Sequence, residues 1–479
     1  MRLQTSILTI IFLPLLGAFI LPLLSRISER IRNLFALLLA LIPLILSLSL
    51  IPLTASGNSF SFSRHFALGF NFTILADGLA VFMACVSTSL SAIIIFYSFG
   101  YISHYENRDE YYTMVVLFLA AMLGLIFSGN ILLLYIFWEI TAITSWRLIG
   151  FFREKNHVLA ADKAFLVTVF GAVSMLLGFV ILYQQYGSFE LAVIRQGAGI
   201  YPVSNLAIIL ILAGIFSKSA TLPFHTWLPD AGVAPSPVTA LLHAAILVKI
   251  GVYVFARLFL MNIYIPWHTL ITVLAAASAL VSAGAALMET DLKRIIAYST
   301  ISQIGFIFFG LAAGNSIAAA GALLYILMHG IAKAGLFLCA GIIEQKTKMR
   351  DITKMGGLIS VMPITAVSFL CCAFSVMGIP PFGGFFSKYL IFSGAAVGTP
   401  LWITLLFLLG AFLTIIYLFR VFNLVFLGEL HLTQVKEGSL TMVSSVAFLA
   451  LLSFLSGLLI KYPAEFTQVI VKNMPVFLR

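Results

Sequence analysis

Charged residues are scarce in this chain. Of its 479 residues only 9% are charged and 62% are hydrophobic, whereas soluble domains carry about 25% charged residues. This composition, with a mean hydropathy of +1.11, excludes a soluble globular enzyme and a disordered protein. The apolar runs are also too long for a β-barrel, whose strands give short alternating segments. We therefore predict an all-α polytopic membrane protein, since each spanning helix needs about 20 mostly apolar residues.

Cysteine is also scarce, and nucleotide-binding motifs are missing. The four cysteines (Cys85, Cys339, Cys371 and Cys372) lie in apolar segments and form no C-x-x-C, which argues against an iron–sulfur cluster, a zinc site or a disulfide framework. No G-x-G-x-x-G and no Walker A sequence occurs, which argues against nucleotide chemistry. We expect no metal and no cofactor in this chain, and no redox chemistry of its own.

The sequence contains fourteen apolar segments. They are roughly 5–24, 33–53, 76–98, 112–127, 130–150, 162–183, 205–225, 236–260, 268–288, 292–312, 317–344, 361–396, 400–427 and 441–461. The first is expected to be a retained helix rather than a signal peptide, because its apolar run is long and no A-x-A cleavage site follows. We expect a single membrane domain over 1–479, with no linker and no soluble domain.

Basic residues fall mainly in short loops, and these loops alternate. One set carries Arg26, Arg30, Arg32, Arg108, Arg153, Lys155, Lys293, Arg294, Lys346, Lys348, Arg350, Lys354 and Lys436, whereas the other carries Arg64, Arg195 and Arg257. The net charge of +10 is therefore better explained by membrane orientation than by nucleic acid, which we exclude as a partner. The positive-inside rule places the first set in the cytoplasm, and an even number of helices then places both termini on the outer side.

Two segments are interrupted by proline. Segment 205–225 runs into a Pro223–Phe224 pair, and segment 361–396 contains a Pro381–Phe382 pair. Proline removes a helical hydrogen bond, so both segments are predicted to break. The breaks lie five segments apart and each has a lysine nearby, which is typical of inverted repeats with a site at their interface.

Ionisable residues inside apolar segments are the candidate functional groups. Charge at the bilayer centre costs at least about 2.5–3.5 kcal/mol, so such residues need a reason. They are Glu139, Lys218, Lys249, Lys333 and Lys388, with His243 and His329. His329 and Lys333 are four apart and share a helix face, while His243 and Lys249, six apart, would lie on roughly opposed sides of one helix.

These groups suit proton movement. Burial makes a lysine easier to deprotonate, and a nearby carboxylate opposes this. A Glu139–Lys218 pair would therefore hold a proton that separation releases, and histidines can relay protons near neutral pH. Hydroxyl groups that could hold bridging waters belong to Ser217, Ser219, Thr221, Tyr298, Ser299 and Ser302.

Each of these residues also has a purely structural interpretation. Glu139 and Lys218 could be a static ion pair, Lys249 and Lys388 could extend to the membrane interface, and Lys333 could serve helix packing. The two histidines could be satisfied buried hydrogen-bonding groups. Residues expected near helix ends, as anchors first and path residues second, are His225, Asp230, Arg147, Asp162, Lys163 and Arg420.

Several motifs resemble one family. They are 217–231 (SKSATLPFHTWLPDA), 291–305 (DLKRIIAYSTISQIG), 329–334 (HGIAKA) and 380–388 (PPFGGFFSK), together with Trp138–Glu139 and the stretch from Leu242 to Gly251. This resembles the antiporter-like membrane subunits of respiratory complex I, Mrp-type cation/proton antiporters and energy-converting membrane-bound hydrogenases. The resemblance covers nearly the whole chain.

The resemblance implies about 14 helices, with discontinuous helices 7 and 12. It divides the chain into helices 1–3 (1–111), a first repeat of helices 4–8 (112–260), an inverted second repeat of helices 9–13 (268–427), and helix 14 with a tail (441–479). The family roles fall on Glu139 and its partner Lys218, the central Lys249, the relay residue His329 and the exit residue Lys388. Lys333 and His243 lie beside them as further relays. Arg147 stands where relatives usually have an apolar residue, and could tune Glu139 if it faces inward.

The function that this resemblance implies is translocation of protons, or of Na⁺, within a multi-subunit complex. Other membrane subunits and peripheral redox subunits are the expected partners, in a redox-driven complex or an Mrp-type antiporter. The end of the chain soon after the expected fourteenth helix, together with Lys388, favours a hydrogenase-type or Mrp-like assembly. Two alternatives stay open, namely a standalone transporter of a small ion or anion and a structural scaffold.

Overall fold

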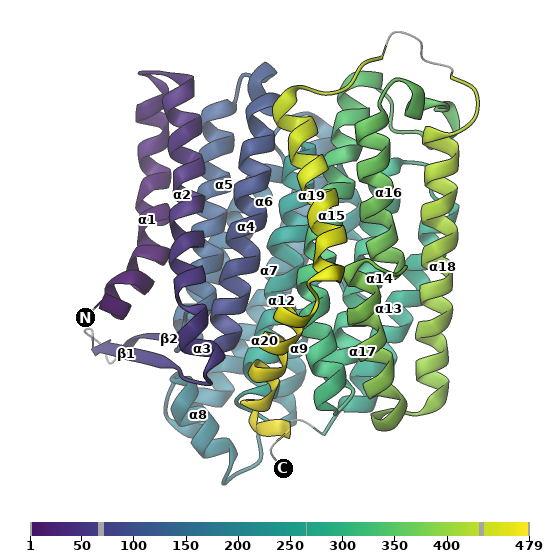
Figure 1. Cartoon of the computed structure of the whole chain (residues 1–479). Coiled ribbons are helices and arrows are strands. Elements are labelled where there is room, and N and C mark those ends of the chain that lie inside the picture. The colour runs from purple at the N-terminus through teal and green to yellow at the C-terminus, as the bar shows by residue number, and fades with distance from the viewer. Residues whose placement is uncertain (1, 66–70, 265, 431–434, 478–479) are drawn as a thin grey trace.

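The structure is a computed structural model that describes residues 2–65, 71–264, 266–430 and 435–477. It is a bundle of helices that run side by side (Figure 1). Twelve spans are long and apolar enough to cross a membrane in the described part of the chain. They are formed by α1 (Arg2–Ser25), α2 (Glu29–Ser49) with α3 (Ile51–Ala55), α4 (Gly78–Tyr101), α5 (Arg108–Ile126), α6 (Ile131–Ile149), α7 (Lys155–Tyr186), α11 (Ser236–Ala240) with α12 (Leu247–Phe255), α13 (His268–Met288), α14 (Leu292–Ala312), α15 (Ser316–Thr347), α18 (Leu401–Phe426) and α19 (Leu440–Leu458).

These spans correspond to twelve of the fourteen predicted segments. The other two, 205–225 and 361–396, are the segments predicted to break. The first forms α9 (Asn205–Lys218) and continues towards the single turn α10 (Trp227–Asp230), and the second forms α16 (Pro363–Met377) and α17 (Gly383–Gly398). The helical membrane fold is thus confirmed, while the number of fourteen crossings stays a prediction.

The break between α16 and α17 follows from its sequence. Gly378 caps α16 with a φ of +82°, a left-handed conformation that glycine adopts without a Cβ clash. Pro380 and Pro381 follow and cannot continue the helix, because proline lacks an N–H and clashes with the preceding turn. The chain re-enters a helix at Gly383.

The span 236–260 contains a break that the sequence analysis did not expect. Between α11 and α12 the residues Leu241–Ala245 form a π-helical turn, and Ile246 leaves helical geometry with φ −130° and ψ −71°. A second π-helical turn, Ala256–Leu260, follows α12. The estimate that His243 and Lys249 lie on opposed sides of one regular helix is therefore wrong, because no continuous α-helix joins them.

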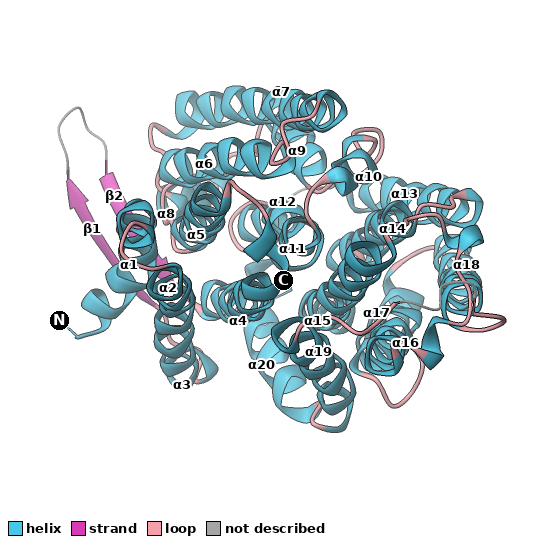
Figure 2. Ribbon diagram, turned by 90° about the horizontal axis from the view of Figure 1, so that it is seen from above, coloured by secondary structure: helices cyan, strands magenta, loops and turns pink. Residues whose placement is uncertain are grey.

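The helices divide into a central set and a peripheral set. In span 236–260, all residues of an 18-residue apolar stretch are buried, and in α14 and α15 the buried share of such a stretch is 94%. In α2 with α3 it is only 33%. Seen from above, α15 lies in the middle of the bundle, next to α14, α17 and α19 (Figure 2). Polar groups on the central helices are therefore enclosed by protein rather than by lipid.

The two ends of the bundle differ in charge. The loops after α1, α4, α6, α13 and α15, which carry most of the predicted basic set, lie at one end, which we call the basic end. Both termini lie at the opposite end, the terminal end (Figure 1). The terminal end also holds α8 (Leu191–Ala198), α20 (Lys461–Lys472) and a hairpin of β1 (Phe60–His65) and β2 (Asn71–Ala76), in which Phe60 faces Ala76. The hairpin and α20 were not anticipated.

A buried ion pair closes the bundle at the terminal end. Asp77, the N-cap of α4, accepts two hydrogen bonds from Arg257, with Arg257 Nη2 2.8 Å from Asp77 Oδ1. Burial alone would raise the pKa of the Asp77 carboxyl, but the charge and hydrogen bonds of Arg257 outweigh it and lower the pKa below its ordinary value. Arg257, expected in an outer loop, is thus a fixed structural cation.

Breaking this pair is predicted to destabilise the protein strongly. Replacing Arg257 by Met leaves the Asp77 carboxylate buried without its partner, which costs about 3–5 kcal/mol. The melting temperature in detergent should fall by several degrees in Arg257→Met. The control is Lys461→Met, which removes a cation from an exposed pair whose side chains are 77% and 60% exposed and should leave it unchanged. Equal melting temperatures for the two variants would contradict the prediction.

Candidate ion-translocation site

The predicted lysines and histidines gather in the interior of the bundle. Lys218, Lys249, Lys333, His243 and His329 are completely buried and Lys388 is 4% exposed. The four lysines come from four different helices, as predicted: α9, α12, α15 and α17. None of them extends to the membrane interface, so the predicted alternative of interfacial lysines is wrong for Lys249 and Lys388.

Glu139 and Lys218 form the first part of the site. Glu139 lies in the middle of α6 and Lys218 is the last residue of α9, where the C-terminal end of the helix favours a cation. The two charges interact electrostatically, but Lys218 Nζ has no hydrogen-bond partner among the described residues. Lys218 Nζ instead lies 5.3 Å from the centre of the Trp138 ring. The pair is therefore a separated one, not a locked salt bridge.

Lys249 lies next to the unexpected helix break. Its Nζ donates a hydrogen bond to the carbonyl oxygen of Ala244, within the π-helical turn. The turn thus provides an acceptor for a buried cation, in line with the frequent occurrence of π turns at functional sites. Ser219 lies directly against Gly251, and so joins the region of Lys218 to that of Lys249.

The two histidines lie between the lysines without fixed partners. Neither ring nitrogen of His243 or His329 has a hydrogen-bond partner among the described residues. His243 packs against the Phe337 ring, with centroids 4.4 Å apart. His329 interacts electrostatically with Lys249, Lys333 and Lys388. If these histidines are satisfied buried hydrogen-bonding groups, their partners are therefore water molecules and not described protein groups.

Lys333 is held by a network of hydrogen bonds. Its Nζ donates to the Ile296 carbonyl at 3.1 Å and to Ser299 Oγ at 2.6 Å. Tyr417 Oη donates to the same Ser299 hydroxyl at 2.7 Å and lies 3.4 Å from Thr414 Oγ1. The network begins at the lysine and leads across to α18.

The same network continues to Lys388. Gln303 donates to Thr414 Oγ1 at 3.2 Å and accepts a hydrogen bond from Tyr325 Oη at 2.6 Å. Lys388 Nζ lies 5.5 Å from the centre of the Tyr325 ring and donates to the Val376 carbonyl, at the broken end of α16, at 2.7 Å. A series of hydrogen bonds thus runs from Lys333 to Tyr325, and the last step to Lys388 is a cation–π contact with the Tyr325 ring. Roles for Tyr417, Thr414, Gln303 and Tyr325 were not predicted, because single polar residues in an apolar helix give little signal.

Several buried polar atoms along this row are not paired with protein. Besides the histidines and Lys218, they belong to Ser87, Ser91, Trp138, Glu139, Ser219 and Thr221, as judged from the described residues. Buried polar groups normally find a partner in protein or ordered water. The row is therefore suited to hold water molecules that connect its members.

The remaining predicted residues lie nearer the ends of the bundle. Arg147 pairs with Glu110 at the start of α5, together with Arg153, so its charge is engaged there and not at Glu139. His225 is half-buried beyond the break after α9. Asp162 accepts a hydrogen bond from Trp146 Nε1 at 2.8 Å. Arg420 donates to the carbonyls of Leu287 and Glu289 at the end of α13.

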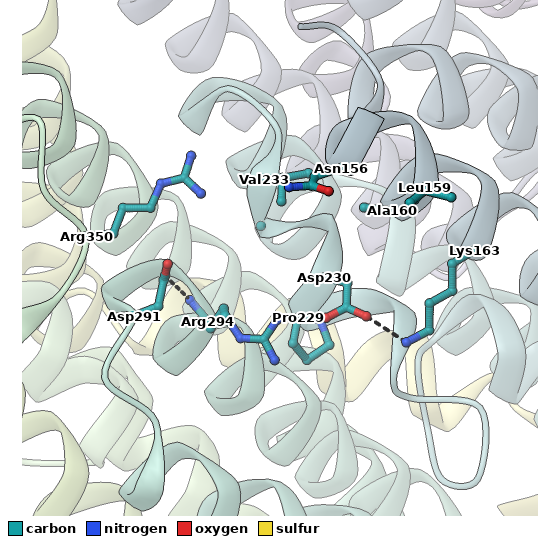
Figure 3. A pocket seen from close by; sticks show the side chains of 11 residues that line it. Asn156, Leu159, Ala160, Lys163, Pro229, Asp230, Val233, Asp291, Arg294 and Arg350 are labelled. Atoms are coloured by element: carbon teal, nitrogen blue, oxygen red, sulfur yellow. Dashed lines mark hydrogen bonds and ion pairs between the residues drawn. The ribbon is translucent and has the colours of Figure 1, made fainter. Parts of the chain in front are cut away.

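A cavity of about 330 Å³ opens at the basic end, where the two predicted repeats meet (Figure 3). Its lining includes Asn156, Lys163, Asp230, Asp291, Arg294 and Arg350. Asp230 bridges Lys163 of α7 at 2.6 Å and Arg294 of α14 at 2.7 Å. Partial burial would raise the pKa of Asp230, but these two partners outweigh it and lower the pKa below its ordinary value.

The described residues contain no cluster of three or more His, Cys, Asp or Glu that could hold a metal ion. The four cysteines are free and lie within helices. The chemistry of the site consists of amines, imidazoles, hydroxyls and one carboxylate inside a membrane bundle. Such a protein belongs to the multi-pass helical membrane proteins that contain ionisable side chains in their interior.

Comparison with known proteins identifies the family. Residues 128–414 match the family described as "NADH:quinone oxidoreductase/Mrp antiporter, TM", and residues 64–112 match "NADH-Ubiquinone oxidoreductase (complex I), chain 5 N-terminus". The first match covers more than half of the chain, so the chain belongs to the NADH:quinone oxidoreductase/Mrp antiporter family. The predicted resemblance is confirmed.

Curated relatives include components of cation antiporters. An Na(+)/H(+) antiporter subunit of Alkalihalophilus pseudofirmus is 37% identical over 403 residues, which is 79% of this chain and 50% of that protein. An Na(+)/H(+) antiporter subunit of Staphylococcus haemolyticus is 34% identical over 96% of this chain and 62% of that protein. The chain therefore spans between one half and two thirds of the length of these relatives.

Two solved structures share the fold. A chain of the Mrp complex from Dietzia sp. DQ12-45-1b superposes with a TM-score of 0.90 at 21% identity, covering 99% of this chain and 98% of that one. A chain of the membrane-bound sulfane sulfur reductase, an archaeal respiratory membrane complex, superposes with a TM-score of 0.88 at 24% identity, covering 98% and 97%.

Removing the Tyr417 hydroxyl is predicted to loosen the network between Lys333 and Lys388. Tyr417→Phe removes the hydroxyl that bonds Ser299, while Ser299 keeps Lys333 and Thr414 keeps Gln303. Loss of this one buried hydrogen bond costs about 0.5–1.5 kcal/mol, and the melting temperature in detergent should fall. Tyr389→Phe, on a tyrosine that is 59% exposed on α17, is the control and should melt like the wild type. A Tyr417→Phe variant as stable as this control would show that the hydrogen bonds are not formed.

Proposed function

We propose that this chain is an ion-translocating, antiporter-like subunit of a multi-subunit membrane complex of the Mrp type. The proposed translocated ion is the proton, and Na⁺ is the alternative. The observation that carries the proposal is the protein-enclosed row of ionisable groups from Lys218 to Lys388. The names of the curated relatives, Na(+)/H(+) antiporter subunits, support the Mrp type over a redox-driven complex. Partner membrane subunits are then part of the working unit.

The row gives the proposed order of transfer. Protons enter from the basic end, reach Lys218 and Lys249, pass the region of His329 and Lys333, and leave at Lys388. Interactions of His329 with Lys249, Lys333 and Lys388 support the later steps, and the contact of Ser219 with Gly251 supports the step from Lys218 to Lys249. From Lys388, α17 runs to the terminal end of the bundle, which makes that end the exit.

Glu139 is the proposed point of coupling to a neighbouring subunit. It is only partly buried, and it lies between Ile136 and Ile143, which are 45% and 54% exposed on the same face of α6. A carboxylate on a lipid-facing surface is costly, so a partner subunit covering this face would stabilise it. Movement of Glu139 relative to Lys218 would then change how tightly Lys218 holds its proton.

Substitution of Lys249 tests the proposed function. In the intact complex reconstituted into vesicles, Lys249→Ala is expected to slow proton translocation at least twofold, because the central proton carrier of the row is lost. Lys249→Arg should be equally slow, since arginine keeps its charge and cannot release a proton. A merely structural cation would tolerate arginine.

The control for this experiment is Lys155→Ala, at an exposed position of the basic end. It should translocate protons like the wild type, as measured with a pH-sensitive dye. Wild-type rates in both Lys249 variants would refute the proposed function.

The orientation is proposed from the positive-inside rule. The chain would lie in the cytoplasmic membrane with its basic end in the cytoplasm and both termini outside. Cysteine introduced at the exposed Glu106, at the basic end, should resist a membrane-impermeant maleimide in intact cells, whereas cysteine at the exposed Asn58 should react. The unsubstituted protein provides the background, and the reverse labelling pattern would overturn the orientation.

A further inference from the structure

A second carboxylate–lysine pair lies between the cavity at the basic end and the central row. Lys293 Nζ, on α14, is 3.1 Å from Glu344 Oε2, on α15. Lys293 also donates to the Ala234 carbonyl at 2.6 Å, and Glu344 accepts hydrogen bonds from Ser236 and Arg350. The proposed transfer route leaves this pair unused.

Exposure decreases stepwise through the pair. The side chain of Arg350, which lines the cavity, is 31% exposed, that of Glu344 is 19% exposed and that of Lys293 is 1% exposed. Lys293 lies behind Gly232, another residue of the cavity lining. The three side chains therefore lead from solvent into the closed interior in a single series of contacts.

The interior end of this series meets the central row. Lys333 Nζ binds the carbonyl of Ile296 and the hydroxyl of Ser299, which lie one and two turns deeper on α14 than Lys293. At a rise of about 1.5 Å per residue, the first of these steps is about 4.5 Å along the helix axis. His243 interacts electrostatically with both Lys293 and Lys333. Lys293 of α14 and Lys333 of α15 therefore lie at successive levels along α14.

The Lys293–Glu344 pair lies in a different part of the fold from Glu139 and Lys218. Glu139 and Lys218 lie on α6 and α9, within the first predicted repeat, whereas Lys293 and Glu344 lie on α14 and α15, within the second. Each pair combines one carboxylate with one buried lysine. The two pairs reach the row at different points, since Lys218 leads to Lys249 and Lys293 leads to Lys333.

We infer that Glu344 and Lys293 form a second proton inlet, which carries protons from the cavity at the basic end directly to Lys333 without passing Glu139 and Lys218. This inference rests on the proposed function, because an inlet needs a translocated proton. A proton taken up by the Glu344 carboxylate passes to Lys293 as that lysine gives up its own proton towards Lys333. Arg350 holds the carboxylate at the cavity wall.

The test compares Glu344→Gln with Glu344→Asp in the intact complex in vesicles. The rate of proton translocation is measured over a series of proton concentrations on the basic-end side. Glutamine cannot carry a proton, so Glu344→Gln should close this inlet, lower the rate by up to twofold and raise the proton concentration for half-maximal rate at least threefold. Glu344→Asp restores the carboxylate and should recover more than half of the lost rate.

The matched control is Glu154→Gln, which neutralises a carboxylate with a 73% exposed side chain at the same end and should behave like the wild type. In a Glu139→Gln background, which weakens the first inlet, Glu344→Gln should slow translocation by a larger factor than in the wild type, because the two inlets act in parallel. If Glu344→Gln does not assemble, the half-maximal proton concentration of Glu344→Asp decides, and it should be raised.

Two results would overturn the inlet. One is a wild-type rate and half-maximal concentration in Glu344→Gln. The other is a lowered rate in both Glu344 variants at an unchanged half-maximal concentration, which indicates a structural role. The Lys249→Ala variant, measured in the same vesicles, separates this failure from that of the proposed function. If Lys249→Ala slows translocation while Glu344→Gln does not, only the inlet is wrong.

Discussion

The cost of placing charge inside a membrane is the constraint on which the rest of this structure depends. The four lysines of the central row lie in the interior, and the helices around them are arranged so that none faces lipid. Three of these lysines donate to backbone carbonyls: Lys249 to Ala244, Lys333 to Ile296 and Lys388 to Val376. Two of those carbonyls belong to helix breaks, where the regular hydrogen-bond pattern leaves acceptors free. The helix breaks thus supply the carbonyl acceptors that stabilise two of the buried lysines.

Charged groups near the ends of the bundle form direct ion pairs, whereas several ionisable groups at its centre do not. Asp77 with Arg257 and Glu110 with Arg147 form direct pairs with two or more hydrogen bonds. Lys218 and the two central histidines have no such partners among the described residues. A directly paired charge changes its protonation state at higher cost than a loosely surrounded one. The pairs of Asp77 and Glu110 therefore fix the frame, and the centre keeps groups that exchange protons more readily.

Much of this arrangement was predictable from the sequence, for a physical reason. Long apolar runs define spanning helices, and prolines at 223 and 380–381 define breaks, because both effects are local to the chain. The distribution of lysines over four helices followed from the same segments. The π-helical turn near His243 was not predictable, since it carries no proline and depends on packing between neighbouring helices. The Tyr417 network was not predictable for a similar reason, because Ser299, Thr414 and Gln303 come together only in the folded chain.

The magnitudes explain why a small displacement of Glu139 can matter. Moving one elementary charge against 100 mV costs about 2.3 kcal/mol, while two unit charges 4 Å apart interact by about 4 kcal/mol at an effective dielectric constant of 20. A carboxylate that approaches or leaves Lys218 therefore changes its proton affinity by an amount comparable with the membrane potential. A locked salt bridge would forfeit this sensitivity, because its charges could not separate without a large penalty. In the proposed function, the gap between Glu139 and Lys218 is thus the feature that would let a neighbouring subunit influence the row through electrostatics alone.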